Sequence, residues 1–236
     1  MVYGWNDVVD YETDILNPRK GSFWFGAQAT KPQLKQLWLP ILLVQLVTIV
    51  PMIYYGGWLM ALIFLSFFVI NGLYNLPKHG LRSKPPFELF CQIGYLLIVP
   101  LSIILNDTGS LPWQTYAYLS LFSIQSHLMG EVMDIAPDRE AGRQTTGTLL
   151  GVKKTKLLII GIMAAEIAVL FITFKEYIFG SILGLGLLWL ILDLFVVFRA
   201  KQYTVNQMKL FAFASNGIAM ITIAYVWYSG CLSSVK

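Results

Sequence analysis

The chain has 236 residues, of which 56% are hydrophobic and only 13% are charged, and its mean hydropathy is +0.64. A soluble domain carries about a quarter charged residues, so this composition excludes an ordinary water-soluble globule and indicates that lipid surrounds most of the surface. The net charge of +4 comes without the clustered basic stripe that nucleic-acid binding requires, so we expect no nucleic-acid partner.

Seven apolar segments are long enough, or nearly so, to cross a hydrocarbon layer of about 30 Å as helices. The predicted spans are Leu37–Tyr55, Trp58–Tyr74, Leu89–Leu105, Pro112–Met129, Leu157–Phe174, Tyr177–Phe198 and Leu210–Tyr228. Gly56 and Gly57 favour a tight turn between the first two spans. The sequence therefore predicts an all-α fold, a polytopic transmembrane helix bundle that forms one domain over residues 1–236.

The basic residues define the topology. Of the 17 Lys and Arg residues, only Lys175 and Lys236 lie on one side of the predicted membrane. The other fifteen lie in segments that share the opposite side, namely 1–36, 75–88, 130–156 and 199–209. The positive-inside rule makes this second side cytoplasmic.

Eight of the 13 acidic residues lie in two short clusters on the predicted cytoplasmic side, at a membrane boundary. The clusters repeat one spacing, i, i+3, i+7, in Asp7, Asp10, Asp14 and in Glu131, Asp134, Asp138. On a helix these positions lie within about 60° of one another, so each set predicts one acidic stripe. Pro137 favours an end or a bend of the helix before Asp138, which weakens the prediction at the second cluster.

Converging carboxylates repel one another unless a cation lies between them. Mg²⁺ prefers hard oxygen ligands and commonly bridges carboxylates to the phosphates of a substrate. Two facing stripes therefore predict Mg²⁺ ions that clamp a diphosphate. The alternative is that each cluster is a solvated loop.

The first cluster lies in a segment that resembles a motif of the UbiA superfamily of intramembrane prenyltransferases. Residues 6–14 read NDVVDYETD and match the first Asp-rich motif of that family, NDxxDxxxD, at every fixed position. Residues 17–21, NPRKG, are similar to the basic continuation in members that act on carotenoids, such as lycopene elongases.

The second cluster and the loop between the clusters carry the same resemblance. Residues 134–142 read DIAPDREAG and are similar to the second motif, DxxxD, with the trailing glycine and threonines completed by residues 145–151. Glu131 stands where the family often has Asp, which preserves the charge of the ligand. Tyr74 and Lys78 match the YxxxK motif of the family.

The resemblance implies a bundle of nine transmembrane helices, with the first motif near the cytoplasmic end of the second helix. This chain starts five residues before that motif and has seven predicted spans, so we expect the domain to lack two N-terminal helices. The implied function is a membrane prenyltransferase with its active site on the cytoplasmic side. Two alternatives are a UbiA-type terpene cyclase, which quenches the cation internally, and a non-catalytic membrane protein derived from a truncated enzyme.

The resemblance also implies roles for individual residues. A prenyl diphosphate would ionise between Mg²⁺ ions, and a lipophilic acceptor would capture the carbocation. The expected metal ligands are Asn6, Asp7, Asp10 and Asp14 for one ion and Glu131, Asp134 and Asp138 for the other. The expected catalytic residues are Asp7, Asp10, Asp14, Asp134 and Asp138. The expected diphosphate contacts are Tyr74 and Lys78, with Arg19, Lys20, Arg139 and Arg143 as weaker candidates that serve equally well as topology-setting charges.

Three further ionisable residues are singled out by their positions. His127 lies four residues before Glu131 and is predicted either to hydrogen-bond that carboxylate or to pack as a polar residue between helices. Glu166 and Asp193 lie inside predicted spans, where an ionisable group indicates a cavity or a partner.

Overall fold

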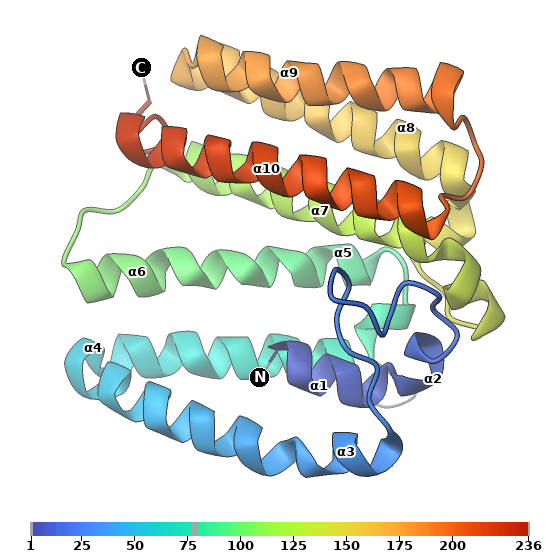
Figure 1. Ribbon diagram of the computed structural model, residues 1–236. Coiled ribbons are helices and arrows are strands. Elements are labelled where there is room, and N and C mark those ends of the chain that lie inside the picture. The colour runs from blue at the N-terminus through green and yellow to red at the C-terminus, as the bar shows by residue number, and fades with distance from the viewer. Residues whose placement is uncertain (1, 77–79, 236) are drawn as a thin grey trace. The chain divides into compact units, whose positions relative to one another are not determined.

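A computed structural model describes residues 2–76 and 80–235 as helices joined by loops (Figure 1). In this part of the chain there is no β-strand, and one isolated bridge pairs Ser22 with Gly26. The predicted all-α class is therefore confirmed. The helical elements in chain order are α1 (Val2–Val9), α2 (Tyr11–Asp14), α3 (Lys31–Gln36), α4 (Trp38–Asn75), η1 (Leu81–Ser83), α5 (Phe87–Gln92), η2 (Ile93–Leu97), α6 (Ile98–Asn106), α7 (Trp113–Glu140), α8 (Thr146–Val169), η3 (Leu170–Phe174), α9 (Tyr177–Leu192), η4 (Asp193–Val197) and α10 (Val205–Ser229).

The chain divides into two compact units. The first contains Met1–Ser110 and Pro137–Thr145, and the second contains Leu111–Ala136 and Thr146–Lys236. The boundary falls inside α7 and divides the second acidic cluster, because Glu131 and Asp134 precede it and Asp138 follows it. Each unit is described by itself below.

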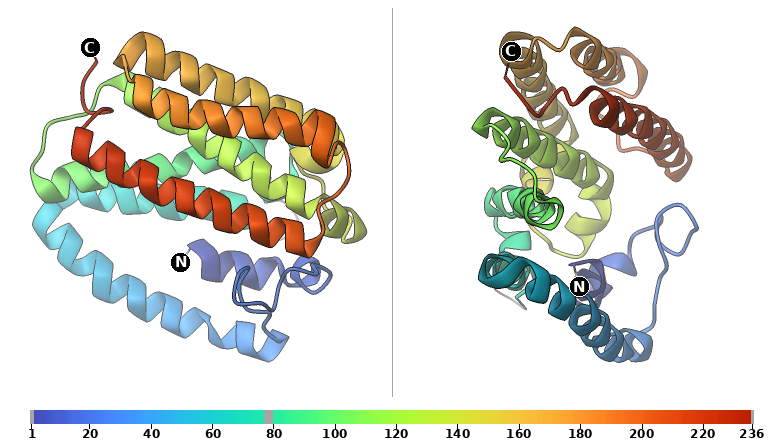
Figure 2. Two further views of the ribbon diagram at one scale, coloured as in Figure 1. Left: turned by 45° about the horizontal axis from the view of Figure 1, so that its top comes forward. Right: turned by 90° about the vertical axis from the view of Figure 1, so that its left-hand side faces the viewer.

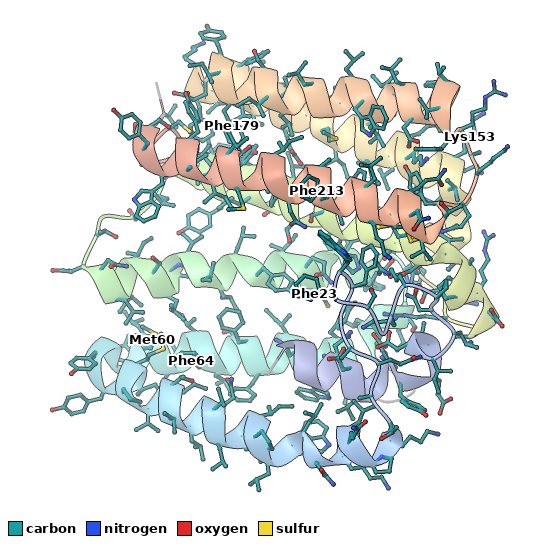
Figure 3. The ribbon with its side chains drawn as sticks, viewed as in Figure 1. Phe23, Met60, Phe64, Lys153, Phe179 and Phe213 are labelled. Carbon is teal, nitrogen blue, oxygen red and sulfur yellow. The ribbon has the colours of Figure 1, made fainter. Side chains whose placement is uncertain are left out.

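The first unit is built on a helical hairpin within α4. The hairpin turns at Gly57, whose φ of 66° and ψ of −156° are not helical. Elements α1 and α6 pack on α4, and an edge-to-face pair of Trp5 and Trp38, with ring centroids 5.9 Å apart, joins α1 to the start of α4. Met60 and Phe64 project from α4 close to the turn (Figure 3), and the side chain of Met60 is fully buried.

The second unit is a set of long helices. Helices α8 and α9 lie side by side, and α10 packs on α9 (Figure 2). A buried apolar cluster joins the helices and the C-terminal segment, and its members are Tyr118, Leu170, Phe174, Phe179, Cys231 and Leu232. By contrast, large side chains such as Trp227 and Tyr228 are exposed, as expected where lipid rather than protein covers a helix.

Five helical segments are long and apolar enough to cross a membrane: Lys31–Asn75, Phe87–Asn106, Thr146–Phe174, Tyr177–Val197 and Val205–Ser229. All seven predicted spans lie largely on helices, but the count of seven is not confirmed. Two of the predicted spans fall within the first segment, on either side of Gly57. The span predicted at Pro112–Met129 lies on α7, which is not one of the five apolar segments because its sequence contains several Ser, Gln and acidic residues.

The hairpin turn provides a test of the first unit. The φ and ψ of Gly57 lie in a region that only glycine adopts readily, and no atom lies near enough to obstruct an added methyl group. We expect Gly57→Ala to lower the free energy of unfolding by about 1–3 kcal/mol, from backbone strain alone. Gly109→Ala is the matched control, since that glycine is also in open space but lacks the positive φ. Unfolding of the purified protein in detergent measures the stability of both variants. Equal stabilities of Gly57→Ala and Gly109→Ala would contradict the positive φ at Gly57.

Candidate active site

The first acidic motif lies on two short helices rather than one. Asp10 falls between α1 and α2 with φ of −92° and ψ of 5°, so the predicted uninterrupted stripe is wrong at this residue. The N–H groups of Asp10 and Asp14 nevertheless donate to the carbonyls of Asn6 and Asp10, both at 2.8 Å. Lys20 Nζ lies 3.0 Å from Asp14 Oδ2 and 3.6 Å from Asp7 Oδ1. One ammonium thus bridges two carboxylates of the motif, which share a face.

The remaining carboxylate of this motif, Asp10, is only 5% exposed and lies among cations. Its Oδ1 accepts a hydrogen bond from Arg82, and its Oδ2 accepts from Asn6 Nδ2 at 2.8 Å and from Arg143 Nη1 at 3.3 Å. Arg143 Nη1 also lies 3.8 Å from Oδ1 of Asp138, which is buried. The first unit therefore brings a carboxylate of each motif to the same guanidinium group.

Arg82 lies in the basic segment 75–88, and the structure gives it a place in this cluster. Its Nη2 donates to the carbonyl of Val9 at 2.9 Å, in addition to the pair with Asp10. Burial and the nearby Arg143 guanidinium lower the pKa of Arg82 to about 10, and Asp138 opposes this shift. Arg82 therefore remains protonated at neutral pH. Its signal in the sequence was its place in the loop that follows Tyr74.

The second motif lies on α7, which continues through Pro137 to Glu140. Of the end or bend that Pro137 favours before Asp138, the end is therefore wrong. Glu131 is buried, and its Oε2 accepts a hydrogen bond from the N–H of Gly147 at 2.6 Å. Gly147 lies in the first turn of α8, where the helix itself leaves N–H groups unpaired. The sequence singled out the neighbouring threonines but missed Gly147.

His127 lies on the face of Glu131, as its spacing predicted. Its Nε2 is 3.2 Å from Glu131 Oε1, within ion-pair distance, although among the described residues this oxygen accepts no hydrogen bond. Asp134 is half-buried on the same helix. A His so close to a carboxylate can hold it in one orientation.

The other predicted substrate contacts are more scattered. Tyr74 is half-buried near the end of α4, and Lys78 lies outside the described residues. The guanidinium of Arg19 stacks 5.4 Å from the ring centroid of Phe25, in the loop between α2 and α3. Arg139 is exposed on the last turn of α7. The structure therefore gathers Lys20 and Arg143 with acidic side chains of the motifs.

The donors of the first unit suit a magnesium ion by their chemistry, since they are carboxylates and one amide oxygen. Asn6 Oδ1 is buried and has no hydrogen-bond partner among the described residues. This oxygen atom is therefore available as a metal ligand beside Asp10. In residues 2–76 and 80–235, no three Asp, Glu, His or Cys side chains are grouped as a metal site would require. Arginine and lysine side chains neutralise the carboxylates instead.

These features can be compared with known proteins. The chain matches the family model of the UbiA prenyltransferase family over residues 1–229. The chain belongs to the UbiA prenyltransferase family. With the five apolar helical segments, this membership identifies a multi-pass membrane protein.

Several proteins similar in sequence to this UbiA-family chain have names that refer to lycopene or to carotenoid biosynthesis. It is 29% identical over 157 residues to a lycopene elongase/hydratase of Corynebacterium glutamicum, a match that covers 64% of this chain and 54% of the relative. It is 29% identical over 158 residues to a lycopene elongase/hydratase of Haloferax volcanii, covering 66% and 50%. It is 27% identical over 183 residues to the C(50) beta-cyclic carotenoids biosynthesis protein LbtBC of Dietzia sp., covering 72% and 40%. The matches thus span about half the length of these relatives, and no solved structure matches the chain.

The UbiA-family chain also buries ionisable residues away from its motifs. Asp193 was predicted to have a partner or a cavity, and its Oδ2 lies 2.6 Å from Lys156 Nζ. Glu166 is fully buried on α8, and neither of its carboxyl oxygens has a hydrogen-bond partner in the described part of the chain. The partner is thus confirmed for Asp193.

The approach of Gly147 to Glu131 is close enough to test. A methyl group at Gly147 would lie 2.9 Å from Glu131 Cβ, which is too close, and 3.1 Å from Oε2, which is a tight contact. We expect Gly147→Ala to displace the Glu131 carboxylate and to lower the free energy of unfolding by about 1–3 kcal/mol. Gly161→Ala, on the same helix but in open space, should leave stability unchanged or raise it by up to about 1 kcal/mol. Equal thermal unfolding of the two variants in detergent would rule out the close contact.

Proposed function

We propose that this chain carries the active site of a prenyltransferase that moves an isoprenoid group from a prenyl diphosphate to a lipophilic acceptor. Family membership supports prenyl transfer as the type of reaction. The relatives described as lycopene elongase/hydratase support a polyene of the lycopene type as the acceptor. The distribution of Lys and Arg supports an active site on the cytoplasmic side.

The observation that carries the proposal is the cluster around Asp10. Arg143 contacts a carboxylate of each Asp-rich motif, Asp10 and Asp138, and Arg82 pairs with Asp10. A diphosphate is a polyanion whose oxygen atoms accept paired hydrogen bonds from a planar guanidinium group, so the same two arginines suit it. The cluster therefore holds both components that a metal-bound diphosphate needs, namely acidic ligands and fixed cations.

In the proposed site one Mg²⁺ would be held by Asn6, Asp7, Asp10 and Asp14, and another by Glu131, Asp134 and Asp138. When bound, the ions would supply positive charge that offsets the negative charge of the diphosphate. The residues of the chain have three further tasks. Arg82 and Arg143 bind diphosphate oxygens and leave Asp10 free to act as a ligand. Lys20 orients Asp7 and Asp14. His127 and the N–H of Gly147 fix the Glu131 carboxylate. Tyr74 and Lys78 add contacts to the diphosphate, with Arg19 and Arg139 as weaker candidates.

The reaction itself tests the proposal. Membranes that contain the protein are incubated with a labelled prenyl diphosphate, with and without lycopene. We expect label to enter the carotenoid fraction only when lycopene is present. Label in a cyclic product formed without any acceptor would instead support the terpene cyclase alternative, and no turnover of the diphosphate in either case would reject both.

Metal removal provides a second test. We expect EDTA treatment to abolish turnover and Mg²⁺ to restore it, because the acidic motifs would otherwise face an anionic substrate. Asp10→Ala and Asp134→Ala should each reduce kcat below detection while the protein still inserts into the membrane. The control is Glu12→Ala, which removes an acidic side chain of the same segment that is 75% exposed and paired with Lys31. Full turnover in EDTA, or equal rates in Asp10→Ala and Glu12→Ala, would contradict the metal mechanism.

The role of Arg82 is tested by charge removal. Loss of one charge-assisted hydrogen bond costs on the order of 1.5–3 kcal/mol, so Arg82→Gln should raise the KM for prenyl diphosphate roughly ten- to a hundredfold. The KM for the acceptor should change little. Lys84→Gln removes the same charge from an exposed position in the same loop and controls for general attraction. An equal rise of KM in both variants would mean that the loop attracts the diphosphate only through its general positive charge, and the specific role of Arg82 would be wrong.

A further inference from the structure

Helix α7 contains a defect at the second acidic motif. Pro137 lies inside the helix, and a proline has no N–H to donate to the carbonyl four residues earlier, which belongs to Met133. Its ring also crowds that carbonyl, so an interior proline normally breaks or kinks a helix. Here the helix continues through Pro137 to Glu140.

The missing donor comes from the loop between η4 and α10. The side-chain Nε2 of Gln202 donates to the Met133 carbonyl at 2.9 Å and to the neighbouring Val132 carbonyl at 3.0 Å. These contacts lie within the second unit. Gln202 thus donates two hydrogen bonds to the turn of α7 in which the Met133 carbonyl lacks the backbone donor of residue 137.

The loop that carries Gln202 is itself held by buried charges. Lys156 is fully buried, and its Nζ lies 2.6 Å from Asp193 Oδ2 and donates to the Arg199 carbonyl at 3.1 Å. Tyr203 donates from its hydroxyl to the same oxygen of Asp193 at 2.5 Å, and the ammonium lies 4.3 Å from the centroid of its ring. Separating a buried ion pair leaves an uncompensated charge, which is strongly unfavourable. These contacts therefore fix Tyr203, the residue next to Gln202. Because the two residues are adjacent, the position of the Gln202 side-chain amide is restricted as well.

We propose that Gln202 is a positioning residue for the second acidic motif. Its amide supplies the hydrogen bonding that Pro137 removes, so α7 stays helical and keeps Asp134 and Asp138 at a spacing of one helical turn. The significance of that spacing for metal binding rests on the proposed function. The replacement of the hydrogen bond by Gln202 is independent of the proposed function, and it is measurable in protein free of metal and substrate.

The proposal predicts that Gln202 matters only because residue 137 is a proline. Three variants of the full chain test this: Gln202→Met, which keeps the bulk of the side chain without a donor, Pro137→Ala, which restores a backbone N–H, and the double variant. Hydrogen–deuterium exchange of the α7 amides near residues 133–141 is the readout, in detergent and without metal.

We expect Gln202→Met to accelerate exchange about tenfold or more, a factor that corresponds to about 1.4 kcal/mol. In the Pro137→Ala background the same substitution should change exchange by less than about twofold, since net hydrogen-bond contributions are small when another donor is present. Lys201→Ala, an exposed neighbour in the loop, should have no effect. Equal acceleration in both backgrounds, or none in the chain with Pro137, would overturn the proposal. If Gln202→Met does not fold, folding of the double variant supports it and failure of the double variant overturns it.

Binding of Mn²⁺, followed by electron paramagnetic resonance without substrate, separates this inference from the proposed function. We expect Gln202→Met to weaken Mn²⁺ binding about tenfold and Pro137→Ala to restore it, in parallel with the exchange data. Unchanged Mn²⁺ affinity despite faster exchange would overturn the role of Gln202 in positioning the motif. If the unsubstituted protein binds no Mn²⁺ but shows the coupling in exchange, the proposed function fails and the hydrogen-bond replacement stands.

Discussion

A carboxylate that is almost entirely buried has to be neutralised, and Asp10 imposes this requirement on the first unit. Removing a charge from water is unfavourable by several kcal/mol unless cations and hydrogen bonds compensate. Asp10 receives Arg82 from η1, Arg143 from the segment after α7 and the amide of Asn6 from α1. The need to neutralise one side chain thus joins three stretches of chain that are far apart in sequence. Arg143 extends the connection to Asp138, and so to the second motif.

Two buried carboxylates of the second unit meet the same requirement in different ways. Asp193 is paired with the ammonium of Lys156 and accepts from Tyr203, which makes a buried site with a cation of its own. Burial, together with the hydrogen bond to Asp193, raises the pKa of the Tyr203 hydroxyl, which therefore stays protonated as the donor. Glu131 instead accepts from a backbone N–H at the start of α8, with His127 beside it. A carboxylate held in this way keeps more of its negative charge available, which suits a residue proposed as a metal ligand.

Helix α7 shows how polar content and helical order are reconciled. Its sequence contains many polar residues, an interior proline and the second acidic motif, and it is not among the segments apolar enough to span a membrane by composition. Several of its side chains are nevertheless buried by other parts of the protein, including Thr115, whose hydroxyl donates to the Leu232 carbonyl at 2.5 Å. A helix shielded by protein needs satisfied hydrogen bonds more than an apolar surface.

The sequence by itself determined the helical class, the approximate positions of the helices and the acidic motifs, because apolar runs and residue spacing are local properties. It also placed His127 beside Glu131, since a spacing of four residues is fixed by the geometry of a helix. Local rules were wrong at Asp10, where the helix is interrupted, and at Pro137, where it is not. Tertiary structure decided which cation each buried carboxylate receives and which glycine a carboxylate approaches. Such contacts join residues remote in sequence, so they depend on how the helices pack, and no local pattern specifies them.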